Sequence, residues 1–219
     1  ISSSVVSFSF PQPATTNRIK NMNKSGAQFD HEKLTFISKN VISRFTAEKV
    51  YSDVLNYAKN YDEELYNLIK DRQEYVTKMF SIERGTNKPR KDISCYSEIK
   101  TLYYYFFNEL FDKCDKDYPF DERFKKETIK EILRRYLSSY DENDEKDVWF
   151  NKIKFLAEDL GFASDMKEYK ANKDNYMGSY ADTAGIIRIA LTKETNTPDL
   201  YEICRLLKKD EIKRRIDLI

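Results

Sequence analysis

The stretch that decides the fold is Gly185–Leu207, which reads GIIRIALTKETNTPDLYEICRLL. An apolar run ends at Leu191-Thr192, a polar loop follows, and Thr197-Pro198-Asp199 opens a second apolar-periodic segment. Threonine at an N-cap, proline at the first helical position and an acid in the first turn are strong signals of a helix start. The stretch therefore predicts two helices joined by a loop, with Thr197 capping the second helix.

Three cations, Arg188, Lys193 and Arg205, surround this predicted turn. Free backbone N–H groups at the helix start and these side chains would point the same way, which suits an electron-rich partner such as a nucleic acid. The same features also fit an ordinary helical hairpin, because any such hairpin needs a cap. On the local sequence both interpretations stay open.

The remainder of the chain also carries apolar residues at helical spacing, and no useful length alternates as a strand would. We expect helices at residues 31–45, at 46–60, at 62–80, from Ser94 or Ser97 to about 111, from Asp121 to 139, and from Asp144 or Asp147 to Gly161, followed by the C-terminal helices, the last from about Asp210. In the first of these, Leu34, Ile37, Val41 and Phe45 are expected to face inward. The predicted fold class is all-α, a helical bundle or cage of two subdomains. We expect residues 17–118 and 119–219 to form them, with residues 1–16 as an extended lead-in.

Composition limits the function classes. The 38 Lys and Arg residues balance 37 Asp and Glu residues, so any nucleic-acid site is a local patch and not a general basic coat. No apolar run is long enough for a membrane span. Cys95, Cys114 and Cys204 are odd in number and widely spaced, which predicts buried thiols in a reducing compartment, the cytoplasm. We expect a monomer with neither a DNA nor a membrane partner.

Two long connections, residues 81–93 and 161–179, are where function is expected to concentrate. The first offers Arg84, Lys88, Arg90 and Lys91, a set of donors that fits either RNA binding or a solvated surface loop. The aromatic run 103–107 resembles a base-stacking platform, but its helical spacing favours a buried stripe.

The stretch Gly185–Leu207 resembles the C-terminal end of bacterial glutamyl-tRNA synthetases, where an RxALT segment precedes a (T/S)PxL(Y/F)E helix start and paired leucines. The resemblance covers roughly Asn17 to Ile219. Three further segments resemble the same family in the same order: Asn23–Leu34 (NKSGAQFDHEKL), Ile82–Gly85 (IERG) with Lys88–Ile93 (KPRKDI), and Lys167–Lys170 (KEYK). Four segments in register are a specific signal.

The resemblance implies an anticodon-binding region whose partner is tRNA-Glu, with the N-terminal subdomain near the anticodon stem and the C-terminal one at the anticodon loop. Unstacked bases would then be read along their edges at the Thr197 turn. Thr192–Thr195 departs from the TG-containing turn that is frequent in the family, so no RNA contact is assigned to Lys193 or Glu194. The residues expected to bind RNA are Arg84, Lys88, Arg90, Lys91, Arg188, Thr197, Pro198, Asp199 and Leu200.

Catalysis is not expected from this chain alone. Class I synthetases use an HxGH motif and a KMSKS-type loop, whereas His31 is the only histidine. Met22–Ser25 superficially resembles a KMSKS loop, but it runs into the NKSGAxFDxEKL segment that the family carries downstream of its true loop. No cofactor is expected in this region, and the resemblance assigns ATP and Mg to a catalytic domain that this sequence lacks. Two alternatives remain: a glutaminyl or class I lysyl synthetase, and a helical adaptor that binds a protein groove without salt-sensitive RNA binding.

Overall fold

The structure is a computed structural model that describes residues 30–219, and every regular element in that range is helical. An isolated bridge pairs Ala163 with Ser179, and no strand forms among the described residues. The predicted all-α class is confirmed. The elements in chain order are α1 (His31–Ile42), α2 (Ala47–Tyr61), α3 (Glu63–Ile69), α4 (Gln73–Ser81), η2 (Tyr96–Glu98), α5 (Ile99–Tyr103), η3 (Tyr104–Phe106), α6 (Asn108–Phe111), α7 (Lys126–Ser139), α8 (Lys146–Asp159), α9 (Met166–Ala171), η4 (Lys173–Asn175), α10 (Tyr180–Thr192) and α11 (Leu200–Ile216).

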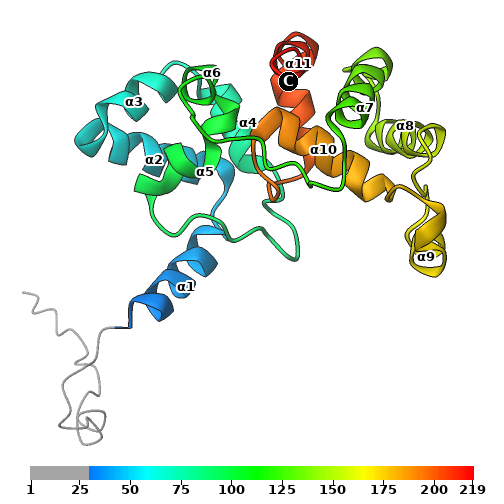
Figure 1. The fold of residues 1–219 in the computed structure, drawn as a ribbon. Helices are drawn as coiled ribbons and strands as arrows, with labels where there is room; N and C mark the ends of the chain where they lie inside the picture. The colour runs from blue at the N-terminus through cyan, green and yellow to red at the C-terminus, as the bar shows by residue number, and fades with distance from the viewer. Residues whose placement is uncertain (1–29) are drawn as a thin grey trace, which may run out of the picture.

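The helices gather into two lobes, α2–α6 and α7–α11, while α1 projects away from both (Figure 1). An irregular segment, residues 112–125, connects the lobes. One continuous apolar core includes residues of both, from Val50 in α2 to Ile212 in α11. The division into subdomains near Pro119 stays a prediction, and the lead-in predicted for residues 1–16 lies outside the described residues. Within residues 30–219 no helix is both long and apolar enough to cross a membrane.

The N-terminal lobe is built around α2. The Thr46 side chain accepts a hydrogen bond from the Lys49 N–H and caps this helix. Val50, Val54 and Ala58 are fully buried, as their helical spacing predicts.

The single helix predicted for residues 62–80 is wrong, because a turn at residues 70–72 divides it into α3 and α4. Asp62 caps α3 as expected, accepting from the Leu65 N–H at 3.0 Å. The turn redirects the chain, so that both short helices pack against α2.

The aromatic run 103–107 lies in the core, with no member more than 6% exposed, so the buried-stripe interpretation is confirmed. The continuous helix predicted through Phe111 is wrong. Phe107 is extended, with φ −121° and ψ 117°, and separates η3 from α6. Consecutive residues lie about 100° apart around an α-helix, so five in a row cannot all face one core. Breaking the helix allows all five rings to be buried.

Helix α1 begins at His31 as predicted but ends at Ile42, three residues before the predicted end, and its apolar face is not buried. Asp30 caps the helix by accepting from the Lys33 N–H at 2.9 Å. Leu34, Ile37 and Val41, expected to face inward, are 48–50% exposed. The error arises because periodicity identifies an amphipathic helix without saying what covers its apolar side. Residues 23–29 of the family-like segment lie outside the described residues.

In the C-terminal lobe, α7 ends at Ser139 as predicted but begins at Lys126 instead of Asp121. The Asp121 carboxylate accepts from the Arg123 N–H two residues on, which forms a separate turn before the helix. Helix α8 begins at Lys146, between the two starts that the sequence offered.

The predicted end of α8 at Gly161 is confirmed. Gly161 has φ +78°, and its N–H and that of Phe162 donate to the carbonyls of Glu158 (3.0 Å) and Ala157 (2.9 Å). This pair of bonds satisfies the last carbonyls of the helix. The irregular segment expected after it contains α9 and η4.

Helix α11 is bent at Lys208, whose φ of 63° and ψ of 166° are not helical. The residues beyond the bend agree with the separate last helix expected from about Asp210.

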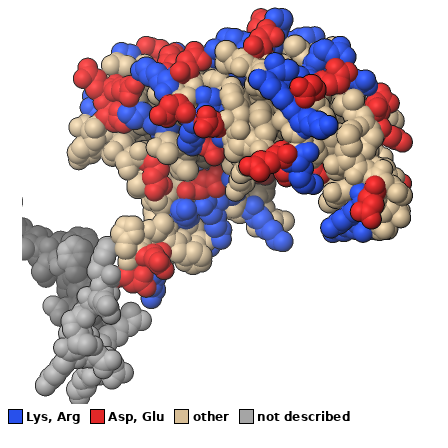
Figure 2. All heavy atoms as spheres, in the orientation of Figure 1, with Lys and Arg blue, Asp and Glu red and all other residues tan. Residues whose placement is uncertain are grey.

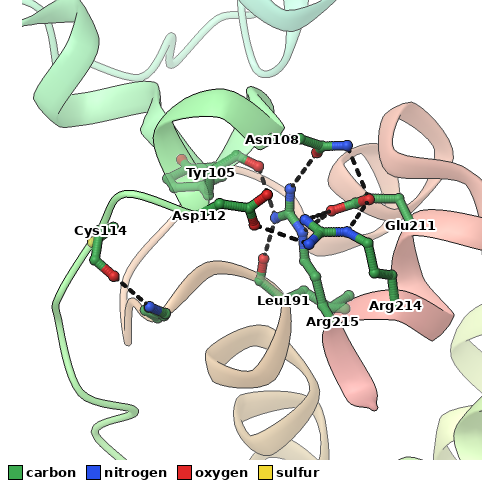
Figure 3. Close-up of polar contacts among 9 residues, drawn as sticks. Tyr105, Asn108, Asp112, Cys114, Leu191, Glu211, Arg214 and Arg215 are labelled. Carbon is green, nitrogen blue, oxygen red and sulfur yellow. Dashed lines mark hydrogen bonds and ion pairs between the residues drawn. The ribbon is translucent and has the colours of Figure 1, made fainter. Parts of the chain in front are cut away.

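A buried arginine on this last segment, Arg215, joins the two lobes (Figure 3). Its Nη1 donates to the carbonyls of Tyr105 (2.8 Å) and Leu191, while Nη2 and Nε donate to the side chains of Asn108 (3.2 Å) and Glu211 (2.6 Å). A buried charge is costly unless it is paired and hydrogen-bonded, and here it is both. The last turns of α11 are thereby tied to α10 and to the N-terminal lobe.

The prediction of three buried thiols is wrong for two of them. Cys95 is exposed and Cys114 is half-buried, whereas Cys204 is fully buried. Burial raises the pKa of Cys204 to about 12, and the Tyr136 hydroxyl donates to its sulfur at 3.2 Å.

Candidate RNA-binding surface

Arg84 fixes the base of the basic loop, residues 83–91. Its Nε donates to the carbonyl of Phe80 at 2.8 Å, and its Nη1 donates to the carbonyls of Ile42 (2.6 Å) and Phe45 (3.2 Å). These groups lie at or just beyond the ends of α4 and α1, where carbonyls lack partners within the helix. Burial lowers the pKa of Arg84. The loop is therefore anchored at its base to the ends of two helices.

Arg90 joins this loop to the turn that precedes α11. Its backbone N–H donates to the Glu83 carbonyl at 3.2 Å and closes the loop. Its Nη1 and Nη2 donate to the Thr197 carbonyl (3.0 Å) and the Asn196 side chain (3.3 Å), and its Nε pairs with Asp92. Two regions that the sequence analysis selected separately thus meet, although they are 107 residues apart.

Arg188, on α10, approaches the same turn. Its Nη1 donates to the carbonyls of Thr197 (3.3 Å) and Pro198 (3.1 Å) and to the Thr197 hydroxyl. Its Nε and Nη2 have no hydrogen-bond partner among the described residues. Burial lowers the pKa of Arg188 and the Arg90 cation adds to this effect, against the opposing charge of Asp199. An arginine stays charged in proteins, so two donor nitrogens remain for an external acceptor.

Helix α11 begins two residues later than predicted, because Asp199 and not Thr197 is its N-cap. The Asp199 carboxylate accepts from the Glu202 N–H at 3.2 Å, and its other oxygen pairs with Lys146 at 2.7 Å. Aspartate caps a helix at least as well as threonine, so Asp199 can take the cap without loss. The Thr197 hydroxyl is instead bonded to Arg188, and its residue is only 5% exposed.

The sequence of this helix-and-turn arrangement matches the family model described as an anticodon binding domain over residues 47–219. The chain belongs to this anticodon-binding domain family. Similar proteins include glutamate–tRNA ligases of Clostridium perfringens strain 13 (40% identical over 196 residues, 89% of this chain and 36% of the relative), Acetivibrio thermocellus (39% over 198 residues, 90% and 36%) and Sorangium cellulosum (32% over 207 residues, 94% and 36%). The chain therefore spans little more than a third of the length of these curated relatives.

In this anticodon-binding domain, the nine residues expected to bind RNA fall into separate groups. Arg90, Arg188, Thr197, Pro198 and Asp199 meet at the turn, which we call the Thr197 turn. Lys88 and Lys91 are exposed elsewhere on the loop, Arg84 anchors it, and Leu200 is buried at 5% exposure. Contact of each with RNA stays a prediction.

The loop 192–195 is held by contacts that the sequence analysis did not predict. Lys193 has φ 55°, the left-handed conformation that favours glycine, so the turn keeps a glycine-type backbone without glycine. Its Nζ donates to the Cys114 carbonyl at 2.7 Å, and the Tyr104 hydroxyl donates to the Thr192 carbonyl at 2.6 Å. The first bond ties the loop to the segment that connects the lobes, the second ties it to the N-terminal lobe, and together they hold the loop that leads into the Thr197 turn. The sequence analysis considered Tyr104 only as a member of the aromatic run 103–107, and no local pattern there indicates a bond to the Thr192 carbonyl.

Proposed function

We propose that this chain recognises the anticodon of tRNA-Glu, as the anticodon-binding region of a glutamate–tRNA ligase. Membership of the anticodon-binding domain family and the names of its relatives support this assignment. The observation that carries it in the structure is Arg188, which binds the carbonyls of Thr197 and Pro198 through Nη1 and keeps two donor nitrogens without a partner among the described residues. The parent enzyme would join glutamate to tRNA-Glu with ATP and Mg bound in another domain, acting as a cytoplasmic monomer.

The Thr197 turn suits an unstacked base because its donors are held in place before RNA arrives. Arginine can pair two N–H groups with two acceptors on a base edge, which gives geometric selectivity that lysine lacks. Arg90 and Arg188 are held by the same carbonyl of Thr197, so little side-chain freedom is left to lose on binding. Sequence-specific RNA recognition generally reads such splayed bases.

The test is the affinity of the 219-residue chain for a tRNA-Glu transcript and for the same transcript with a changed anticodon. Both are measured at about 50 mM and about 200 mM salt. We expect tighter binding of the unchanged transcript by about tenfold or more, with both affinities falling as salt rises. Equal affinities would refute anticodon recognition. RNA binding that is absent at both salt concentrations would favour the protein-adaptor alternative, and a tRNA-Gln transcript bound more tightly would favour the glutaminyl one.

A further inference from the structure

A second basic site lies between the end of α1 and the loop 83–91. A cleft of about 670 Å³ opens there, within the size range of ligand sites. Arg44 lines it from the α1 side, and Lys88 and Lys91 line it from the loop. Among residues 30–219, no acidic and no aromatic residue lines this cleft. We call it the Arg44 cleft.

The three cations of the Arg44 cleft are exposed and unpaired. Arg44, Lys88 and Lys91 make no ion pair, side-chain hydrogen bond or ring contact with any described residue. The nearby acids do not neutralise them, because Glu83 and Asp92 both pair with Arg90. Figure 2 shows Lys and Arg side chains gathered at the lower edge of the molecule, between α1 and the lobes.

Another groove shows that this charge pattern is not general. Between α4 and α11 lies a groove of about 610 Å³ in which Asp71, Glu74 and Glu202 alternate with the cations. The whole chain has a net charge of only +1. Three unpaired cations without an acid are therefore a local excess that suits a polyanion.

The walls of the Arg44 cleft are fixed relative to each other. Arg84, at the base of the loop, donates to the carbonyls of Ile42 and Phe45, which flank Arg44 in the sequence. The same loop reaches the Thr197 turn through Arg90. One loop thus contributes Arg90 to the Thr197 turn and two lysines to the Arg44 cleft. An RNA strand bound at the turn would therefore have the cleft beside it.

We propose that Arg44, Lys88 and Lys91 clamp the sugar–phosphate backbone of the RNA whose bases meet the Thr197 turn. This inference rests on the proposed function and adds to it a site that supplies affinity without reading sequence. The lining offers no ring for a base to stack on, and lysine acts as a point charge without base selectivity. Backbone phosphates, which carry one charge per nucleotide, are the matching ligand.

The test replaces all three residues with glutamine in the 219-residue chain. Each lost phosphate contact should reduce the slope of log affinity against log salt by about 0.7–0.9, or by about 2–3 for the triple variant. We expect affinity at low salt to fall about tenfold or more, by the same factor for the tRNA-Glu transcript and for the anticodon-changed one. The melting temperature should not change, since exposed charges contribute little to folding.

A matched control removes the same charge from three exposed lysines elsewhere that have no partner in the described part of the chain, Lys59, Lys130 and Lys173. Its salt slope should stay near that of the wild type. If the salt slope fell equally in both triple variants, the lost net charge alone would explain the effect, and the proposed clamp would be overturned.

The remaining outcomes separate the possible ligands. Inorganic phosphate that binds wild type but not the Arg44 triple variant, with tRNA affinity unchanged, would make the cleft a free-anion site and overturn the proposal. Polyglutamate binding lost in that variant, again with tRNA affinity unchanged, would assign the cleft to an acidic protein. If wild type binds RNA without regard to the anticodon, the proposed function fails while the clamp's share of the salt slope is still measured.

Discussion

Three arginines of this fold differ in how many of their side-chain nitrogens are used in hydrogen bonds to the protein. Arg215 and Arg90 use Nε, Nη1 and Nη2 in bonds to the protein, so each serves to hold two segments together. Arg188 uses only Nη1 and keeps two nitrogens free. Since residue type and charge are the same, it is the count of donors unused within the described residues that makes Arg188 the arginine we propose for recognition.

Replacing Arg188 with lysine tests this distinction. The variant keeps the positive charge but loses the planar pair of donors, and a good two-bond pair discriminates by about 1–3 kcal/mol. We therefore expect the preference for the unchanged anticodon to fall about tenfold or more, while the salt slope stays constant because no charge is lost. The measurement is affinity for the two transcripts. Unchanged preference would mean that Arg188 only supports the turn.

At this scale, sequence analysis finds neighbours that a local pattern joins. Arg188 and Thr197 lie on either side of one short loop, and their contact follows from the predicted hairpin. The bond from Arg90 to Thr197 spans 107 residues and required the fold. Arg44 was not selected because an exposed cation near a helix end has no signature in the sequence, and only the fold places it opposite Lys88 and Lys91 in one cleft.

The start of α11 shows how competing helix signals are decided by tertiary contacts. Both Thr197 and Asp199 can cap a helix, and the sequence favoured the threonine followed by proline. In the fold Arg188 occupies the Thr197 hydroxyl, and Asp199 takes the cap. The boundary moved by two residues, but the helix itself and its apolar face were predicted.

Replacing Asp199 with alanine should therefore destabilise the chain. Loss of an N-cap costs about 1 kcal/mol, which corresponds to a fall of about 2–4 °C in melting temperature for a chain of this size. Asparagine at position 199 is the matched control, because it caps comparably without the charge that pairs with Lys146. Thermal unfolding of the two variants decides the matter. If the melting temperature falls equally in both variants, Asp199 stabilises the fold through its ion pair with Lys146 and not through the cap.

Elements differ in how far periodicity alone describes them. Helix α2 was predicted almost to the residue, because its buried stripe follows helical spacing. The segment 99–111 was not, because five consecutive buried aromatics demand breaks that no local signal marks. Helix α1 had the right pattern and the wrong burial, since its apolar face is exposed among the described residues.

On the scale of the whole molecule, the candidate site depends on the arrangement of the lobes. The loop 83–91 comes from the N-terminal lobe, whereas Arg188 and the Thr197 turn come from the C-terminal one. Arg215 holds α11 against both, with Glu211 as its charged partner. A change at this junction should therefore act on stability and on the site together.

Glu211 provides the test of that junction. Burial by itself raises the pKa of Glu211, but hydrogen bonds from Arg214 and Arg215 outweigh it and hold the pKa below the ordinary 4.5. A carboxyl whose pKa is lowered by folding stabilises the fold fully above its unfolded value, and this contribution is lost as the pH falls through the folded value. Replacing Glu211 with glutamine should cost about 3 kcal/mol or more at neutral pH, because it leaves the buried Arg215 without its counter-charge.

Urea unfolding gives the free energy of unfolding of this variant and of wild type, at neutral pH and below pH 4.5. The difference in stability between the two proteins should shrink in acid, because wild-type Glu211 is then protonated. Glu131 is the matched control, because Arg134 and Arg135 bond it and lower its pKa to about 2, yet all three lie at the surface of a single helix. Replacing Glu131 with glutamine should change stability far less, since solvent screens an exposed pair. Equal losses from the two substitutions would mean that Arg215 needs no charged partner. Its bonds to the carbonyls of Tyr105 and Leu191 and to the Asn108 side chain would then be what Arg215 contributes to the junction of the two lobes.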